Sequence, residues 1–204
     1  MKPANNRLMC DLDTPRCRNS LRDVSHIDTK TEKITATITI PEAPEYVVYD
    51  PASDRIFQNI KSSDQVLVID PAGNTVKERW PTAPALKPHG LALDAESHRL
   101  FVAGNNGKLA VMDSTTGKLV ATVDIAPGVD QIAFDAGNKR VYCAAAGGVI
   151  SVVQETADGA TLLADVKTEA KGHTLTVDPK THAVWTACGE KGGTTSYVMR
   201  LVAR

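Results

Sequence analysis

Four titratable side chains occupy the same place in four similar segments of the sequence. Each stands five residues before the aspartate that ends an apolar run, at Glu45, His89, Asp130 and His173. Imidazole and carboxylate groups bind Zn²⁺ and similar ions, and they also hydrogen-bond polar molecules. If the fold brings the four groups to one axis, they form a binding site. We expect its ligand to be a small polar molecule, with a divalent metal held by the same four residues as the alternative.

Three further side chains are expected at the rim of this site. Lys87 and Lys171 each stand two residues before a histidine, in Lys-Pro-His-Gly and Lys-Gly-His-Thr. Trp80 lies in a proline-rich connection and is expected to be exposed beside them, whereas Trp185 is expected in a sheet core. The other interpretation is structural, because a solvated channel mouth tolerates polar side chains without any ligand.

Signatures of covalent or nucleotide chemistry are absent from the sequence. It has no Gly-x-Ser-x-Gly elbow, no Gly-x-Gly-x-x-Gly and no Gly-x-x-x-x-Gly-Lys phosphate loop. Cys188 could approach His173, but no third residue that would orient the pair is evident. We therefore expect no catalytic residue.

Charge and composition narrow the classes of partner. Of 204 residues, 23 are Lys or Arg and 24 are Asp or Glu, so the formal net charge is −1. A nucleic-acid surface needs clustered positive charge, so we expect no nucleic-acid partner. No apolar run approaches the roughly 18 residues of a membrane-spanning helix, so we expect no transmembrane segment. The expected partner is a small polar ligand or another protein.

The four cysteines do not indicate a disulfide framework. Cys143 and Cys188 lie in apolar runs and are expected to be buried free thiols. Cys10 and Cys17 could close a small loop if they are oxidised. No Cys-x-x-Cys or Cys/His spacing typical of zinc occurs, so no cofactor is expected beyond the metal alternative above.

An internal repeat positions all of these residues. An apolar run ending in Asp recurs after steps of 44, 41 and 43 residues, at Asp50, Asp94, Asp135 and Asp178. An aromatic side chain follows each Asp by seven residues, at Phe57, Phe101, Tyr142 and Trp185. This period, with four short strands in each unit, predicts an all-β chain folded as a β-propeller of about four blade units. The aspartates are expected to form turns at the end opposite the candidate site.

Each unit is expected to hold four antiparallel strands, named A to D from the inside outwards. Complete units are expected at 45–81, 89–125 and 130–167. A fourth set has strands A, B and C only, at 173–178, 183–188 and 195–202. The N-terminal part has a C-like strand and a D strand with no A or B before them, at 24–28 and 33–40. We expect residues 1–23 to be an unmatched, disordered segment and residues 24–204 to form the propeller.

The repeat unit resembles the YVTN-repeat β-propeller family, most closely in Asp-Ser-Thr-Thr-Gly-Lys-Leu-Val-Ala-Thr-Val at 113–123. The resemblance covers roughly residues 24–204, although the Tyr-Val-Thr-Asn signature itself is degraded, as in Phe-Val-Ala-Gly-Asn at 101–105. It implies a bacterial protein, usually seven-bladed, in the periplasm or outside the cell. Residues 1–23 have no apolar signal-peptide core.

Two arrangements of the blades are open at this point. The units could close into a four-blade ring, or they could form an open arc of a larger ring, which the resemblance favours. An arc leaves blade faces uncovered, and exposed apolar faces promote self-association.

The resemblance implies a non-catalytic propeller that binds a ligand or protein at the mouth of its channel. Lactonases resemble this fold and place metal ligands or histidines at the same point. A lactonase-like, metal-dependent hydrolase using the same ring of residues is therefore one alternative. A truncated propeller without independent activity is the other.

Overall fold

Short strands joined by tight turns make up the part of the chain that the structure describes. The computed structural model describes residues 6–9, 23–40, 42, 44–168, 171–189 and 196–202, without the side chains of 6–9 and 173. Within these residues every regular element is a strand, and the strands form five separate antiparallel sheets. The all-β prediction is therefore confirmed. The predicted disorder of residues 1–23 falls mostly outside the described residues.

Three sheets are complete four-stranded blades, with strands A to D side by side. Blade 1 consists of β4 (Pro44–Asp50), β5 (Arg55–Ile60), β6 (Gln65–Asp70) and β7 (Thr75–Pro81). Blade 2 consists of β8 (Pro88–Asp94), β9 (Arg99–Gly104), β10 (Lys108–Asp113) and β11 (Leu119–Asp124). Blade 3 consists of β12 (Val129–Asp135), β13 (Arg140–Ala145), β14 (Val149–Thr156) and β15 (Gly159–Lys167). These bounds agree with the predicted units to within a residue or so.

Two further sheets have three strands each. The C blade has the predicted A, B and C strands, β16 (Lys171–Val177), β17 (Ala183–Gly189) and β18 (Ser196–Val202). The N blade has the predicted C and D strands, β2 (Asp23–Asp28) and β3 (Lys33–Thr39). It also has β1 (Asn6–Met9), which pairs with β2 where strand B would lie. No pattern in the sequence indicated β1, because residues 6–9 lie outside the repeat.

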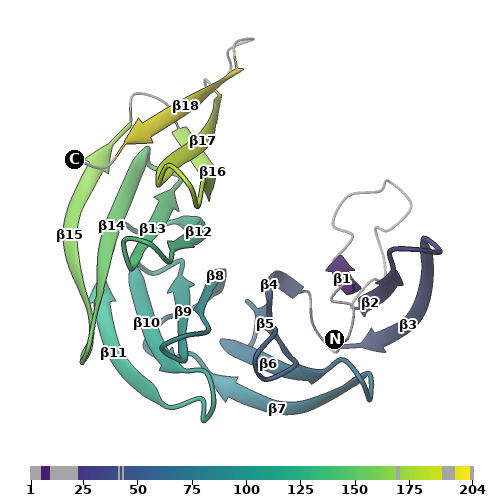
Figure 1. Ribbon diagram of the computed structural model, residues 1–204. Coiled ribbons are helices and arrows are strands. Elements are labelled where there is room, and N and C mark those ends of the chain that lie inside the picture. Colours follow the sequence, from purple (N-terminus) through teal and green to yellow (C-terminus); the bar gives the residue numbers. More distant parts are fainter. Residues whose placement is uncertain are drawn as a thin grey trace.

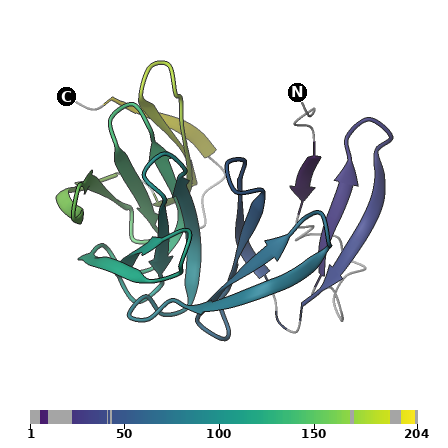
Figure 2. The same cartoon turned by 60° about the horizontal axis from the view of Figure 1, so that its bottom comes forward.

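The five sheets follow one another around an open arc. Both views place the N blade and the C blade at the two separated ends, with blades 1 to 3 between them (Figures 1 and 2). Strands A line the inside of the arc, and the D strands β7, β11 and β15 form its outer edge. The described residues thus form an open arc and not a closed four-blade ring.

Apolar side chains between successive blades hold the arc together. Phe57 of blade 1 packs among Leu91 and Leu100 of blade 2, and Phe101 packs in the same way among residues of blade 3. Both phenylalanines are fully buried, which for a side chain of this size contributes about 2–3 kcal/mol. Trp185 holds the equivalent position in the C blade but is 38% exposed, because no further blade among the described residues covers that face and only the Arg200 guanidinium of its own blade lies over the ring. The prediction that Trp185 lies in a sheet core is therefore wrong.

The repeated aspartates form the A–B turns, as predicted. In blade 1 the Asp50 carboxylate accepts hydrogen bonds from the backbone N–H of Ala52 and the hydroxyl of Ser53. Asp94 and Asp178 accept the same pair of hydrogen bonds in their own turns, and Asp135 accepts from the Gly137 N–H and the Asn138 side-chain amide. Each carboxylate thus replaces backbone partners that the turn lacks.

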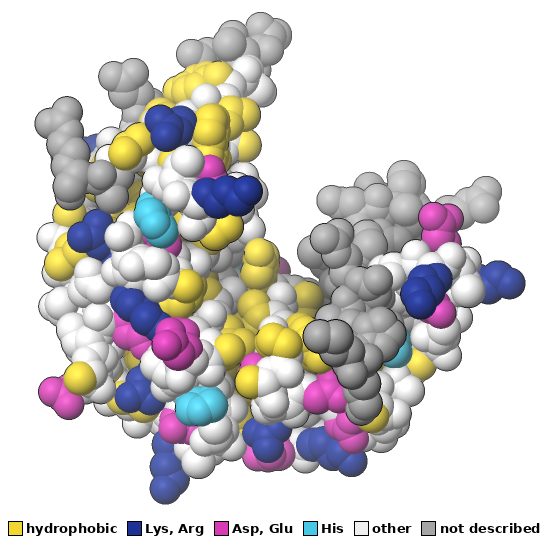
Figure 3. Space-filling view, viewed as in Figure 1, with side chains coloured by type: hydrophobic (Ala, Val, Ile, Leu, Met, Phe, Trp, Pro, Cys, Tyr) yellow, Lys and Arg dark blue, Asp and Glu magenta, His cyan; other side chains and the backbone are white. Residues whose placement is uncertain are grey.

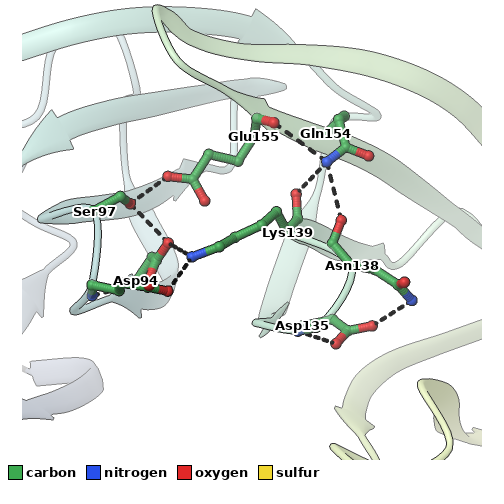
Figure 4. A network of polar contacts seen from close by, with 9 residues as sticks. Asp94, Ser97, Asp135, Asn138, Lys139, Gln154 and Glu155 are labelled. Carbon is green, nitrogen blue, oxygen red and sulfur yellow. Dashed lines mark hydrogen bonds and ion pairs between the residues drawn. The ribbon is translucent and has the colours of Figure 1, made fainter.

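Two of these aspartates also join neighbouring blades, a role the sequence analysis missed. The Lys139 ammonium of blade 3 lies 2.8 Å from the Asp94 carboxylate of blade 2 (Figure 4). His182 Nδ1 of the C blade lies 2.8 Å from Asp135 Oδ1 of blade 3. Lys139 and His182 hold the same place in their turns, four residues after the aspartate, and both have left-handed backbone angles. Burial opposes ionisation of Asp94, but hydrogen bonds from Lys139 and Ser97 outweigh it and lower its pKa to about 2.

Replacing Lys139 with Met should weaken the contact between blades 2 and 3. Asp94 is only 4% exposed, so loss of the ammonium leaves a buried carboxylate short of a partner and should cost about 2 kcal/mol in urea unfolding at pH 7. A carboxyl whose pKa is lowered by folding stabilises the protein above its ordinary value of 3.8, and this stabilisation is lost as pH falls toward 2. Lys139→Met should therefore lose less stability than the wild type over that interval. Lys180→Met, in the equivalent turn of the C blade, is the control, and equal losses in the two variants would contradict the proposed role.

The uncovered face of the C blade should make the chain self-associate. Trp185, Ala187, Val198 and Val202 share this face, and apolar side chains gather at this end of the arc (Figure 3). Light scattering behind size exclusion should show species larger than a monomer at about 100 µM. The double variant Val198→Lys/Val202→Lys should shift the chain toward monomer. A monomeric wild type with cooperative unfolding would show that the face is tolerated in water.

Candidate functional site

An extra residue interrupts strand A at the same point in every blade that has this strand. Pairing with strand B slips by one residue between Pro44 and Val47, Pro88 and Gly90, Val129 and Gln131, and Lys171 and Thr174. All four predicted site residues, Glu45, His89, Asp130 and His173, fall inside these intervals. A β-bulge bends its strand and re-aims a side chain, and bulges are frequent beside binding sites. The repeat thus presents one titratable residue per blade at the inner rim.

Buried polar side chains of strand B hold these bulges. The Gln58 amide donates to the carbonyl oxygens of Glu45 and Tyr46, both at 3.1 Å. The Asn59 amide crosses to blade 2 and donates to the carbonyls of His89 and Gly90, both at 3.0 Å. Carbonyls released from the ladder by the bulge therefore regain partners. The signal available in the sequence was Gln58-Asn59, a polar pair inside an otherwise apolar strand.

Three of the four predicted residues come together. His89 Nδ1 lies 3.1 Å from Asp130 Oδ1 and 3.7 Å from Glu45 Oε2, so blades 1, 2 and 3 each contribute one group. The His89 side chain is 12% exposed, and both carboxylates are more open to solvent. Ionised carboxylates can only accept hydrogen bonds, so Nδ1 carries the hydrogen directed at Asp130. The His173 side chain lies outside the described residues.

A second set of contacts crosses the inside of the arc one residue further along. The Gln131 amide nitrogen donates to the Tyr46 hydroxyl at 3.1 Å, linking blade 3 to blade 1. The Gln131 amide oxygen accepts the backbone N–H of Leu175 in the C blade at 2.9 Å. Strands A of blades 1 and 3 and of the C blade are thereby held at fixed distances, which keeps Glu45 and Asp130 beside His89.

A hollow of about 300 Å³ opens next to this cluster, lined by Glu45, Lys61, Ser62, Asp64 and Lys87. The predicted rim residue Lys87 therefore shares a cavity with Glu45. Lys61 Nζ lies 3.7 Å from Glu45 Oε1, and Asp64 accepts the backbone N–H of Lys87. Residues 61–64 form the B–C turn of blade 1. The sequence analysis did not single these residues out.

Two predicted rim residues are placed elsewhere. Trp80 is only 5% exposed, and its ring packs 5.6 Å from that of Phe57, so its predicted exposure is wrong. The indole fills space left by Gly117 of blade 2, where an added Cβ would lie within van der Waals distance of the ring. Lys171 lines a separate hollow of about 520 Å³ on the C blade, together with Cys188 and Tyr197.

The described residues offer few other candidates for metal binding or thiol chemistry. Among the described residues, no group of three His, Cys, Asp or Glu side chains is placed to hold a metal ion. Cys143 and Cys188 are buried and free, as predicted, and burial raises the pKa of the Cys143 thiol. Cys10 and Cys17 lie outside the described residues. In the same part of the chain, no helix is long and apolar enough to cross a membrane.

Comparisons with known proteins agree with this architecture. No family model matches the chain. A stretch of 118 residues, 54% of the chain, is 35% identical to the seven-bladed beta-propeller protein Rv1057 of Mycobacterium tuberculosis and covers 30% of that protein. The structure also superposes on hydrazine synthase of Kuenenia stuttgartiensis with a TM-score of 0.71, over 78% of this chain and 46% of that one. The fold is that of a β-propeller. At 15% identity the second likeness shows the fold alone, and the propeller described here spans less than half of either protein.

Replacing Gln58 with Leu should disturb the strand-A bulge that carries Glu45. Leu fills a similar volume but cannot donate to the two bulge carbonyls, so unfolding in urea should show a loss of about 2 kcal/mol. Backbone amide resonances of residues 45 and 46 should shift. Gln65→Leu, at the half-buried start of β6, is the control and should cost less than about 0.5 kcal/mol. If Gln58→Leu lowers the free energy of unfolding no more than this control does, the Gln58 amide does not stabilise the bulge.

Proposed function

We propose that this propeller is a non-catalytic binding module whose ligand contacts the Glu45–His89–Asp130 cluster and the hollow beside it. The observation that carries the proposal is the bulge, repeated at one position of strand A, which brings carboxylates from blades 1 and 3 within 3.7 Å of the blade 2 imidazole. A ladder that needed only to be stable would not require an extra residue at this point in every blade. We further propose that the repeats are of the YVTN type, on the strength of residues 113–123.

The charges of the hollow support a ligand with an anionic group. Glu45 is engaged by Lys61 and His89, and Asp64 by the Lys87 backbone. The Lys87 ammonium forms no ion pair with any described residue, so it is the charge left for a ligand. A volume of about 300 Å³ lies at the lower end of the range for small-molecule sites. We therefore propose a small molecule bearing a carboxylate, with its polar groups toward Glu45 and His89.

A carboxylate panel tests this function. ¹⁵N-labelled protein is titrated to about 10 mM with α-amino acids, hydroxy acids and dicarboxylates, and amide shifts are followed. At least one panel member should shift the amides of residues 61–64 and 87–89. The shifts should be lost in Lys87→Met and in His89→Ala. His98→Ala removes an exposed histidine of the A–B turns and should bind like the wild type.

Two outcomes would overturn the proposal. The first is a panel without any shift at these residues, and the second is unchanged binding by His89→Ala. Lactone hydrolysis that depends on added Zn²⁺ or Ca²⁺ and is lost in His89→Ala would favour the hydrolase alternative instead.

A further inference from the structure

A single hydroxyl group lies between two carboxyl groups where blades 2 and 3 meet. Ser97 Oγ is 2.7 Å from Asp94 Oδ2 and 2.5 Å from Glu155 Oε1 (Figure 4). Asp94 and Ser97 belong to the A–B turn of blade 2, and Glu155 belongs to β14 of blade 3. A hydroxyl carries one hydrogen and can donate it to only one of these oxygens. The other short contact needs a second hydrogen, which one of the two carboxyl groups must supply.

The contacts assign this hydrogen to Glu155. Asp94 Oδ2 accepts from the Lys139 ammonium at 2.8 Å, and Asp94 Oδ1 accepts the Glu96 backbone N–H, so its contacts are those of an ionised carboxylate. Glu155 Oε2 is buried and has no hydrogen-bond partner among the described residues. A buried carboxylate oxygen without a hydrogen-bond partner destabilises the folded state strongly when the group is ionised. The same unpaired oxygen in a neutral carboxyl group costs less. The chain therefore runs from the Glu155 O–H to Ser97 Oγ, and from the Ser97 O–H to the Asp94 carboxylate.

Three turns adjoin Glu155: it contacts Ser97 in the first and the Lys139 carbonyl in the second, and its own strand leads into the third. The A–B turn of blade 2 contributes Asp94, Glu96 and His98, that of blade 3 contributes Asp135 and Lys139, and the C–D turn of blade 3 contributes Asp158. The one ammonium, Lys139, is held by Asp94 and Glu96 and forms no ion pair with Glu155. An added negative charge on Glu155 would thus face Asp94 without a cation of its own.

We propose that Glu155 is a pH-sensitive latch between blades 2 and 3, closed when its carboxyl is protonated and released when it ionises. On ionisation the proton passes to solvent, and the single Ser97 hydrogen then has to serve two carboxylates. One contact of about 2.5–2.7 Å would be left between oxygens that share no hydrogen, so the turns would move apart.

The direction of the pH effect follows from linkage. Burial, together with the nearby Asp94, raises the pKa of Glu155 above its ordinary value of 4.5. A group whose pKa is raised by folding holds its proton more tightly in the folded state. Its contribution to stability is therefore complete below 4.5 and is lost as pH rises through the folded-state value.

Glu155→Gln tests the latch, because the amide can donate to Ser97 at every pH. Between about pH 4 and pH 8, the Tm of the wild type should fall by about 3 °C more than that of Glu155→Gln. Glu96→Gln is the matched control: it neutralises an exposed carboxylate of the same cluster and should keep the wild-type fall. The His182–Asp135 contact is the same in all three proteins, so its contribution cancels in the comparison.

A direct readout covers the case in which the variant does not fold. In ¹³C-labelled wild-type protein, the side-chain carboxyl resonance of Glu155 should titrate with a midpoint above 4.5. Ser97→Ala removes the hydroxyl and should move this midpoint, which a merely buried glutamate would not show. A wild-type midpoint at or below 4.5, or parallel Tm profiles for the wild type and Glu155→Gln, would overturn the proposal.

Discussion

Each blade is apolar on both faces, and this single constraint organises the molecule. Strands B of blades 1 to 3 and strands C of blades 1 and 2 are almost entirely buried, with side chains of successive residues pointing to opposite faces. Such a sheet is stable only between two others, so each blade requires a neighbour on either side. The strand-B aromatic shows this requirement clearly, because Phe101 is buried against the next blade whereas Trp185, which has no next blade among the described residues, is exposed. Each twisted sheet must be covered on both faces, and sheets of this kind stack around an arc.

The polar features lie where this apolar stacking cannot reach. At one end of each sheet the strand-A bulge releases carbonyls, and buried amides from strand B satisfy them. At the other end the A–B turns place an aspartate against the following blade, where Lys139 or His182 meets it. Polar contacts therefore connect neighbouring blades at both ends of the sheets, through Asn59 at the bulge end and through Lys139 and His182 at the turn end.

Most of the fold could be predicted from the sequence because the repeat is expressed in strands and turns. The Asp-to-aromatic spacing located the strands of blades 1 to 3 and of the C blade to within about two residues. The convergence of Glu45, His89 and Asp130 was also predictable, because equivalent positions in a repeat lie around one axis. Trp80 was misplaced because its burial depends on Gly117 in the next blade, a complementarity that no single unit shows. The roles of Lys139 and Glu155 were missed for the same reason, since each contacts a different blade from its own.

The Tyr46–Gln131–Leu175 contacts have a mechanical consequence. The Tyr46–Gln131 hydrogen bond joins strands A of the non-adjacent blades 1 and 3 across the inside of the arc, as a chord joins two points on a curve, and Gln131 also binds Leu175 of the neighbouring C blade. Bending the arc at blade 2 in either direction would change the length of this chord and break a hydrogen bond. This hydrogen bond therefore opposes changes in the distance between blades 1 and 3. The spacing of the groups around His89 is then set by the scaffold before any molecule arrives, so a ligand spends little of its binding free energy on ordering the site.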